Sequence, residues 1–145
     1  MKKETTPLTN EEAELLNPIV LAFLGDAVYS LYVRERLVRS GEGKASEYQK
    51  SASKIVSAQG QSAFLEKVLP LFTEEEQAIF RRGKNAKKAT KSKSASNLEY
   101  SRSTGFEAVL GFLHLTGQQE RIEELLSYCD EELFHVVKAE KVFKP

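Results

Sequence analysis

The chain has 145 residues, of which 41% are apolar and 29% charged, and its basic and acidic side chains balance to a net charge of zero. The single cysteine excludes an intrachain disulfide, and the polar first residues predict no signal peptide. The longest apolar run is too short to cross a membrane, so we expect one soluble domain over residues 1–145, located in the cytoplasm.

Helical periodicity runs along nearly the whole sequence, and no segment alternates as a strand would. We therefore predict an all-helical bundle. Thr9 begins a short first helix that stops before Pro18. Asn17 is a good N-cap and Pro18 suits the first turn of a second helix, which we expect to continue to Ser40 and to end at Gly41.

The second helix is predicted to be buried, because residues 18–33 form an apolar run that carries only one charge, Asp26. A buried carboxylate is costly unless a cation, a metal or hydrogen-bond donors meet it. None of the side chains one turn away can neutralise Asp26. Its partner must be a basic residue elsewhere in the fold or a bound ion, and both remain open.

Further helices should follow the second. Ser46 begins a helical stretch to about Ala58, and residues 59–61 (Gln-Gly-Gln) predict a break or a kink before a second piece that ends at Pro70. Thr73 then begins another helix with a capping-box pattern, because a glutamate follows three residues later.

Positive charge is concentrated in residues 81–97, which hold seven basic side chains and no acidic one, so the rest of the chain carries a net charge of −7. The Ser, Lys, Asn and Gly content predicts a mobile loop over about residues 83–97. Such a segment either remains solvated surface or binds a polyanion. The seven basic residues are Arg81, Arg82, Lys84, Lys87, Lys88, Lys91 and Lys93.

Another apolar helix is predicted over residues 104–116, and a last one from about Gln118 to Val137. Glu107 is the only acid in the predicted helix over residues 104–116. It lies at the edge of the apolar face of that helix, where a side chain can face a cleft. Asp26 and Glu107 together offer the oxygen ligands that Mg²⁺ and Mn²⁺ bind. Two such acids beside a basic loop favour metal-assisted phosphodiester chemistry, while an Asp–Arg pair and an exposed glutamate are the structural alternatives.

The segments around both acids resemble a known family. Residues 21–28 (Leu-Ala-Phe-Leu-Gly-Asp-Ala-Val) are similar to the first motif of ribonuclease III domains, and residues 104–111 (Thr-Gly-Phe-Glu-Ala-Val-Leu-Gly) are similar to the second acidic motif. The resemblance is closer still to the Mini-ribonuclease III branch, which lacks a double-stranded-RNA-binding domain. Residues 100–107 (Tyr-Ser-Arg-Ser-Thr-Gly-Phe-Glu) look like that branch's version of the second motif.

This resemblance implies that Asp26 and Glu107 are the catalytic and metal-binding residues of a ribonuclease III-type domain. The broader family has two acids in each motif, but here Ala22 and Thr104 stand where the first acid of each motif is expected. The smaller acid set implies weaker binding of Mg²⁺, for which Mn²⁺ is the expected substitute. Tyr100 and Thr104 are expected to support the site.

The resemblance also implies a magnesium-dependent endoribonuclease that cleaves double-stranded RNA as a homodimer and leaves 5′-phosphate and 3′-hydroxyl ends. It implies a role in ribosome biogenesis, the maturation of the 23S ribosomal RNA precursor, with a large-subunit ribosomal protein as a further partner. The seven basic residues and Arg102, a phosphate or carboxylate partner, are the expected RNA contacts. Gly25 is expected to let two copies of the second helix approach closely.

Two other classes of protein remain as alternatives. A non-catalytic double-stranded-RNA-binding protein with the same fold would explain Ala22 and Thr104, but two lone acids beside phosphates would repel its ligand. A helical adaptor between proteins would explain the apolar helix but not the acids together with the basic loop. Cleavage of RNA distinguishes the nuclease from the non-catalytic RNA-binding protein. Binding of RNA distinguishes both of these from the adaptor.

Overall fold

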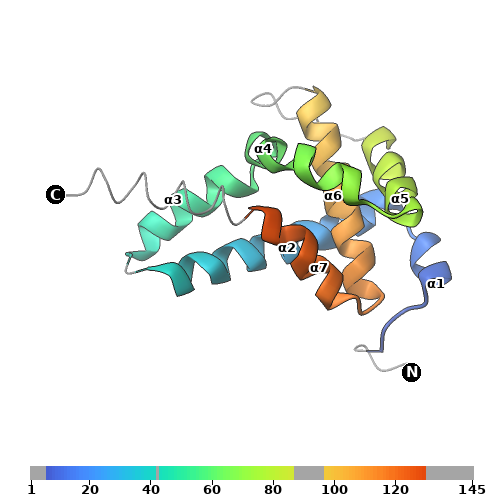
Figure 1. The fold of residues 1–145 in the computed structure, drawn as a ribbon, viewed down its shortest axis with the longest axis horizontal. Helices are drawn as coiled ribbons and strands as arrows, with labels where there is room; N and C mark the ends of the chain where they lie inside the picture. The colour runs from blue at the N-terminus through green and yellow to red at the C-terminus, as the bar shows by residue number, and fades with distance from the viewer. Residues whose placement is uncertain (1–5, 42, 87–96, 130–145) are drawn as a thin grey trace.

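The computed structural model describes residues 6–41, 43–86 and 97–129, and within these ranges the chain is helical with no strand, which confirms the all-helical class (Figure 1). Two short 3₁₀-helices, η1 (Leu69–Leu71) and η2 (Ser127–Cys129), follow α4 and α7. The α-helices are α1 (Asn10–Glu14), α2 (Pro18–Ser40), α3 (Ala45–Val56), α4 (Ala58–Val68), α5 (Glu74–Asn85), α6 (Asn97–Leu115) and α7 (Gln119–Leu126).

Helix α2 begins and ends where the sequence predicts. The Asn17 side chain accepts a hydrogen bond from the backbone N–H of Ile19 at 2.7 Å, and Pro18 occupies the first turn. This cap matters because the first N–H groups of a helix have no partner inside it. Gly41 ends the helix in an extended conformation. Neither α2 nor any other helix in the described ranges is long and apolar enough to span a membrane.

The boundary between α3 and α4 differs from the prediction. We expected a break at residues 59–61, but the chain turns at Ser57, and these residues lie in the first turns of α4. The Ser57 hydroxyl donates to the Lys54 carbonyl at 2.9 Å and accepts from the Gly60 N–H at 3.0 Å. Ser57 therefore ends α3 and caps the start of α4. The cap is a stronger helix boundary than Gly60, the residue that suggested a later break.

The capping box predicted for α5 is confirmed. Thr73 Oγ1 accepts from the Glu76 N–H at 3.1 Å, and the Glu76 carboxylate accepts from the Thr73 N–H at 2.9 Å. Helix α5 continues through Asn85, so the first residues of the predicted loop, 83–85, are helical instead.

The later helices also differ in their bounds from the prediction. Helix α6 begins at Asn97, well before the predicted residue 104, and α7 begins at Gln119, one residue from the expected start. Residues 87–96 of the predicted mobile loop and 130–137 of the predicted last helix lie outside the described residues.

Helices α2 and α6 cross at the centre of the fold, backbone against backbone (Figure 1). A Cβ on Gly25 would lie 1.6 Å from the carbonyl oxygen of Glu107, and a Cβ on Gly111 would lie 2.0 Å from the carbonyl oxygen of Leu21. No side chain fits at either position. We expected Gly25 to admit a second copy of the chain, but in the structure it admits α6 of its own chain.

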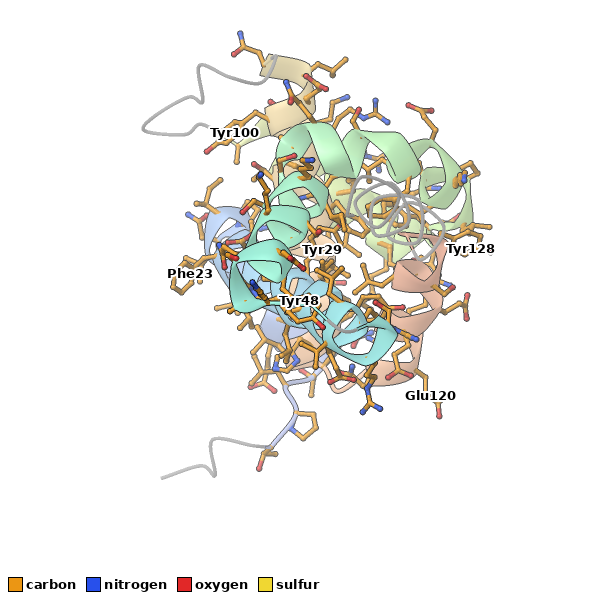
Figure 2. The ribbon with its side chains drawn as sticks, turned by 90° about the vertical axis from the view of Figure 1, so that its left-hand side faces the viewer. Phe23, Tyr29, Tyr48, Tyr100, Glu120 and Tyr128 are labelled. Atoms are coloured by element: carbon orange, nitrogen blue, oxygen red, sulfur yellow. The ribbon has the colours of Figure 1, made fainter. Side chains whose placement is uncertain are left out.

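Three buried aromatic rings lie where α2, α4 and α6 meet. The ring centroids of Tyr29, Phe64 and Phe106 are 5.4 to 6.0 Å apart, and Phe106 meets the other two edge to face. Figure 2 shows Tyr29 inside the bundle, while Phe23 of the same helix points away from it. Edge-to-face pairs add specific geometry to apolar burial, so this aromatic cluster fixes the three helices relative to one another.

Candidate active site

Asp26 and Glu107 meet at the crossing of α2 and α6. Because Gly25 packs on the backbone of Glu107, the next residue of α2 carries its side chain to the Glu107 carboxyl group. The two carboxyl groups are hydrogen-bonded to each other. The crossing thus brings together two acids from distant parts of the sequence, and we call Asp26, Glu107 and the nearby Gln61 the crossing site.

Asp26 is exposed in the described chain, and the expectation that it is buried is wrong. We expected burial because its neighbours are apolar, but some of those neighbours are themselves exposed, Phe23 at 81% and Leu31 at 67%. Helix α2 buries the side that carries Leu21 and Tyr29, and Asp26 lies outside that side. The crossing site is therefore accessible from solvent through Asp26, while Glu107 is half-buried.

The acid pair holds a proton when no cation is bound. The pKa of Glu107 is raised from 4.5 to about 9, chiefly by burial and then by the hydrogen bond and the negative charge of Asp26, while the hydrogen bond from Gln61 lowers it. Two carboxylates in contact resist double ionisation unless a positive charge joins them. Oxygen ligands of this kind suit Mg²⁺, so the donor set at the crossing fits the cation expected from the sequence.

Gln61 of α4 is the third member of the crossing site, and reasoning from the sequence missed it. It is 1% exposed, and its Nε2 donates to the Val56 carbonyl at 3.1 Å and to Glu107 Oε2 at 3.5 Å. Its Oε1 is buried and has no hydrogen-bond partner among the described residues. An unsatisfied buried acceptor costs about 1–3 kcal/mol. The signal in the sequence was its spacing from Phe64 and Leu65, which places Gln61 on the buried face of α4.

Ala22 and Thr104 are both buried, and neither supplies a carboxylate. The Thr104 hydroxyl donates to the backbone carbonyl of Tyr100 at 3.0 Å, so it serves the helix itself. Within the described ranges, no group of three or more His, Cys, Asp and Glu side chains could hold a metal ion. A cation at the crossing would receive two carboxylates from the chain and its remaining ligands from water or substrate.

The first turns of α6 are tied to α4. Arg102 forms a salt bridge with Glu66 at 2.6 Å, with the Arg102 side chain 16% exposed and that of Glu66 72% exposed. Of the two partners expected for Arg102, the structure provides the carboxylate. The Tyr100 carbonyl accepts hydrogen bonds from Ser103 and Thr104, so these turns are held by contacts that the sequence pattern does not show.

The basic residues expected to bind RNA differ in their surroundings. Arg81 is exposed and Lys84 is half-buried near the end of α5. Arg82 donates to the carbonyls of Glu14 and Leu16 at 2.7 and 3.2 Å, so it fixes the end of α1 and would have to leave these carbonyls to meet a phosphate. Lys87, Lys88, Lys91 and Lys93 lie outside the described residues.

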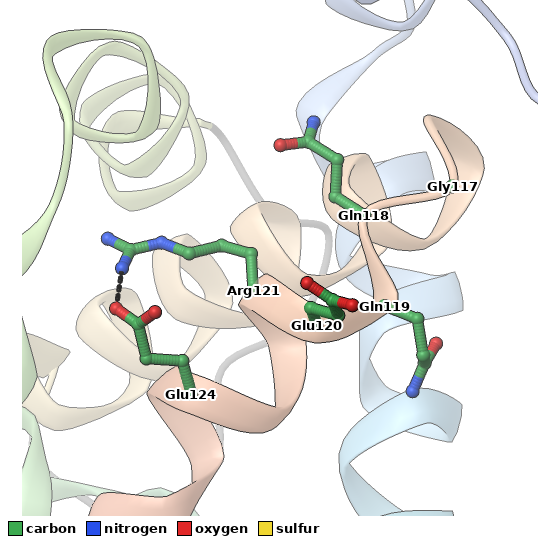
Figure 3. A pocket seen from close by; sticks show the side chains of 6 residues that line it. All are labelled: Gly117, Gln118, Gln119, Glu120, Arg121 and Glu124. Atoms are coloured by element: carbon green, nitrogen blue, oxygen red, sulfur yellow. Dashed lines mark hydrogen bonds and ion pairs between the residues drawn. The ribbon is translucent and has the colours of Figure 1, made fainter.

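A surface pocket lies at the start of α7, and none of the crossing-site residues lines it; Figure 3 shows its lining side chains. Residues 117–121 and Glu124 line it. Its one cation, Arg121, is paired with Glu124, as Figure 3 shows, and with Glu76 at 2.8 Å. Because the carboxylates of Glu76 and Glu124 already pair with Arg121, the described residues of this pocket offer no unpaired cation to an anionic ligand.

Comparison with protein families adds an independent finding. The model of the ribonuclease III domain matches residues 19–118, a range that contains the whole crossing site. A crystal structure of a protein from Fusobacterium nucleatum has the same fold, with a TM-score of 0.71 and 31% identity, over 77% of this chain and 90% of that one.

Several curated proteins named Mini-ribonuclease 3 are similar along most of their length. The protein from Streptococcus pneumoniae is 44% identical over 81% of this chain and 94% of its own. The one from Symbiobacterium thermophilum is 47% identical, over 77% and 85%. The one from Brevibacillus brevis is 40% identical, over 89% and 93%.

Proposed function

Because this chain belongs to the ribonuclease III family, in its Mini-ribonuclease III branch, we propose that it is an endoribonuclease that cleaves double-stranded RNA with the help of Mg²⁺. The observation that carries the proposal is the hydrogen-bonded pair of Asp26 and Glu107 at the crossing of α2 and α6. Two acids in contact, one of them open to solvent, match the one or two carboxylates through which proteins usually bind a hydrated Mg²⁺ ion.

Asp26 and Glu107 would hold the ion, and Gln61 would donate a hydrogen bond to Glu107. When bound, Mg²⁺ supplies activation of the attacking water and stabilisation of the charge that develops on the phosphate. In the overall reaction the water oxygen bonds to phosphorus and the bond from phosphorus to the 3′ oxygen breaks. The products carry a 5′-phosphate and a 3′-hydroxyl. A bound cation would displace the proton that the raised pKa of Glu107 favours in the acid pair.

The small acid set leads us to propose a high magnesium requirement. Ala22 and Thr104 contribute no carboxylate, so substrate phosphate and water would complete the coordination of the ion. Mn²⁺ should replace Mg²⁺, because it accepts the same oxygen ligands. A relative with four acids at these positions is expected to reach half-maximal activity at a lower concentration of magnesium.

Affinity for RNA is proposed to come from basic residues at the end of α5 and in the segment that follows it. Arg81 and Lys84 are the described members, and Lys87, Lys88, Lys91 and Lys93 extend the set. Arg102 would join them if RNA displaces Glu66, and Arg82 if it leaves the end of α1. A-form RNA hides its base edges in a deep, narrow groove, so recognition should depend on phosphates and 2′-hydroxyls.

We propose that the protein acts as a homodimer through α2. Four apolar side chains of this helix are exposed, although helix α2 lies at the centre of the fold. Their spacing keeps them on one side, over a length of about 27 Å at about 1.5 Å per residue. They are Val20, Phe23, Leu31 and Val38. An exposed apolar face of this length, which Arg34 interrupts between Leu31 and Val38, is typical of a protein interface, and Asp26 lies beside it on the same helix.

The cellular substrate we propose is the precursor of 23S ribosomal RNA, which would place the protein in the cytoplasm. A large-subunit ribosomal protein that presents the RNA is a further proposed partner. This part of the proposal depends on membership of the Mini-ribonuclease III branch.

A comparison of substrates tests the proposed function directly. Purified protein is incubated with Mg²⁺ and one of three labelled substrates of equal sequence, namely duplex RNA, single-stranded RNA and duplex DNA. We expect cleavage of duplex RNA only, with products that a ligase requiring a 5′-phosphate accepts. Binding of duplex RNA without cleavage would instead support the non-catalytic alternative.

A further inference from the structure

We propose that Gln61 is the positioning residue of the crossing site, which holds the Glu107 carboxylate for the cation through its side-chain amide. The proposal rests on the proposed metal-dependent function, and it adds a residue from a third helix, α4, to the two acids. Gln61 lies well outside the two acidic motifs in the sequence.

The orientation of the Gln61 amide is determined by its neighbours. The Val56 carbonyl, 3.1 Å from Nε2, can only accept a hydrogen bond, so the nitrogen must face it. The second hydrogen of Nε2 is then directed to Glu107 Oε2 at 3.5 Å. This distance is long, as catalytic hydrogen bonds often are before the ligand binds. A flipped amide would set an oxygen against the Val56 carbonyl.

The backbone that carries Gln61 is itself firmly held. The Tyr29 hydroxyl of α2 donates to the carbonyl of Ile55, next to Val56, at 3.3 Å. Phe64, one turn after Gln61, packs against Phe106, which immediately precedes Glu107. The aromatic cluster thus sets the distance between the amide and the carboxylate, so the contact is built into the three-helix junction.

The donor and the acceptor of the amide have different roles. By donating to Oε2, Gln61 favours the ionised form of Glu107, the form that binds a cation, against the effect of burial. Its Oε1 has no partner in the described part of the chain. The waters that Mg²⁺ keeps are hydrogen-bond donors, so a hydrated cation would bring Gln61 the partner that the chain does not provide.

The variant Gln61→Leu removes the donor and the unsatisfied acceptor while it keeps a buried side chain of similar size. Gln77→Leu is the matched control, because Gln77 also donates to a carbonyl five residues earlier, that of Phe72 at 3.4 Å. Binding of Mn²⁺ to the full chain without RNA is measured from the electron paramagnetic resonance signal of the free ion. Thermal unfolding and the magnesium concentration at half-maximal cleavage are measured on the same samples.

We expect Gln61→Leu to weaken Mn²⁺ binding by about 10- to 100-fold and to raise the magnesium requirement equally, with an unchanged or higher melting temperature. Excess metal should restore the rate of cleavage, and Gln77→Leu should match the wild type in metal binding. If Gln61→Leu does not fold, Gln61→Asn, which keeps an amide too short to join both partners, should show the same loss of metal affinity.

Equal Mn²⁺ affinity in Gln61→Leu and the wild type, with a lower melting temperature, would overturn the proposal and leave Gln61 a structural residue. A wild type that binds no Mn²⁺ and cleaves no duplex RNA would instead overturn the proposed function. The two failures are therefore distinguishable in one series of samples.

Discussion

A Cβ atom on Gly25 would lie 1.6 Å from the carbonyl oxygen of Glu107, so α2 can touch α6 at this point only through a glycine. The contact has a consequence for chemistry, because the residue after Gly25 is Asp26. The backbone approach of the two helices brings one acid to the other, and the same packing that stabilises the fold assembles the crossing site.

Alanine at Gly25 should therefore be strongly destabilising. In an ordinary helix interior, Gly→Ala stabilises by roughly 1 kcal/mol, but here the two helices must separate. We expect Gly25→Ala and Gly111→Ala to lower the melting temperature sharply, and any folded fraction of Gly25→Ala to lose cleavage. Gly43→Ala is the control, because the nearest atoms to its Cβ would belong to two side chains and not to backbone, those of Tyr48 at 3.1 Å and Glu47 at 3.3 Å. Melting temperatures of both crossing variants equal to that of the control would contradict the geometry of the crossing.

The stability of the metal-free protein should decrease as the pH rises. The folded chain raises the pKa of Glu107 from 4.5 to about 9, so between these values the folded state holds a proton that the unfolded state has released. The stabilisation is complete below about pH 4.5 and is lost as the pH approaches 9. Thermal unfolding with a chelator should show Glu107→Gln gaining stability relative to the wild type across this range. Parallel pH profiles for the two proteins would contradict the assignment.

The exposed apolar face of α2 should mediate dimerisation. Phe23→Glu and Leu31→Glu place charges on its most exposed members, and a charge buried without a partner at an interface is costly. We expect each variant to be monomeric by light scattering at concentrations where the wild type is dimeric. Leu98→Glu is the control, because Leu98 is also an exposed leucine but lies on α6. If the wild type is monomeric at every protein concentration tested, the proposal that the protein is a homodimer is wrong.

The salt bridge between Arg121 and Glu76 should be one of the larger contributions of a polar pair to stability. Arg121 donates to both Glu76 oxygens at 2.9 and 2.8 Å, and Glu76 is 3% exposed. Arg121→Leu leaves a buried carboxylate without its cation, which should cost about 3–5 kcal/mol in urea unfolding. Glu124→Gln removes only the exposed partner of Arg121 and should cost less than about 1 kcal/mol. Similar losses from both variants would be unexpected.

Basic residues beyond α5 should control affinity for RNA rather than the rate of the chemical step. Replacing Lys87, Lys88, Lys91 and Lys93 with alanine should raise the KM for duplex RNA and leave kcat nearly unchanged. The dependence of log affinity on log salt should become shallower by roughly 1 for each phosphate that a lysine no longer neutralises. Binding measured from about 50 to 200 mM salt tests this. An unchanged slope would show that the four lysines do not bind RNA and are solvated surface residues.

The sequence was most informative where structure depends on neighbouring residues. Asn17 with Pro18, and Thr73 with the glutamate that follows it, predict the starts of α2 and α5 because a cap is made within one turn of the chain. The two acids could be recognised because each stands alone in an apolar segment and matches a motif. Their meeting at one point required only that two apolar helices pack together.

The errors concern contacts between distant segments. Helix α2 is apolar on several sides, so its sequence does not show which side packs on α6, and Asp26 was expected to be buried for that reason. Helix α6 begins at Asn97, earlier than predicted. Its first turns carry no periodic apolar face that the sequence could show, and they are tied to α4 by the salt bridge between Arg102 and Glu66. Gln61 was interpreted as part of a break, because its contact with Glu107 exists only in the folded chain.

If Asp26 and Glu107 together hold the cation that cleaves duplex RNA, neither acid can be replaced by its amide. The decisive measurement compares wild type, Asp26→Asn and Glu107→Gln for cleavage of a long duplex RNA in magnesium, with binding of the same duplex measured alongside. We predict cleavage by the wild type alone and retained binding by all three proteins. Cleavage by either variant at the wild-type rate, or binding without cleavage by the wild type, would show that the two acids do not have this role.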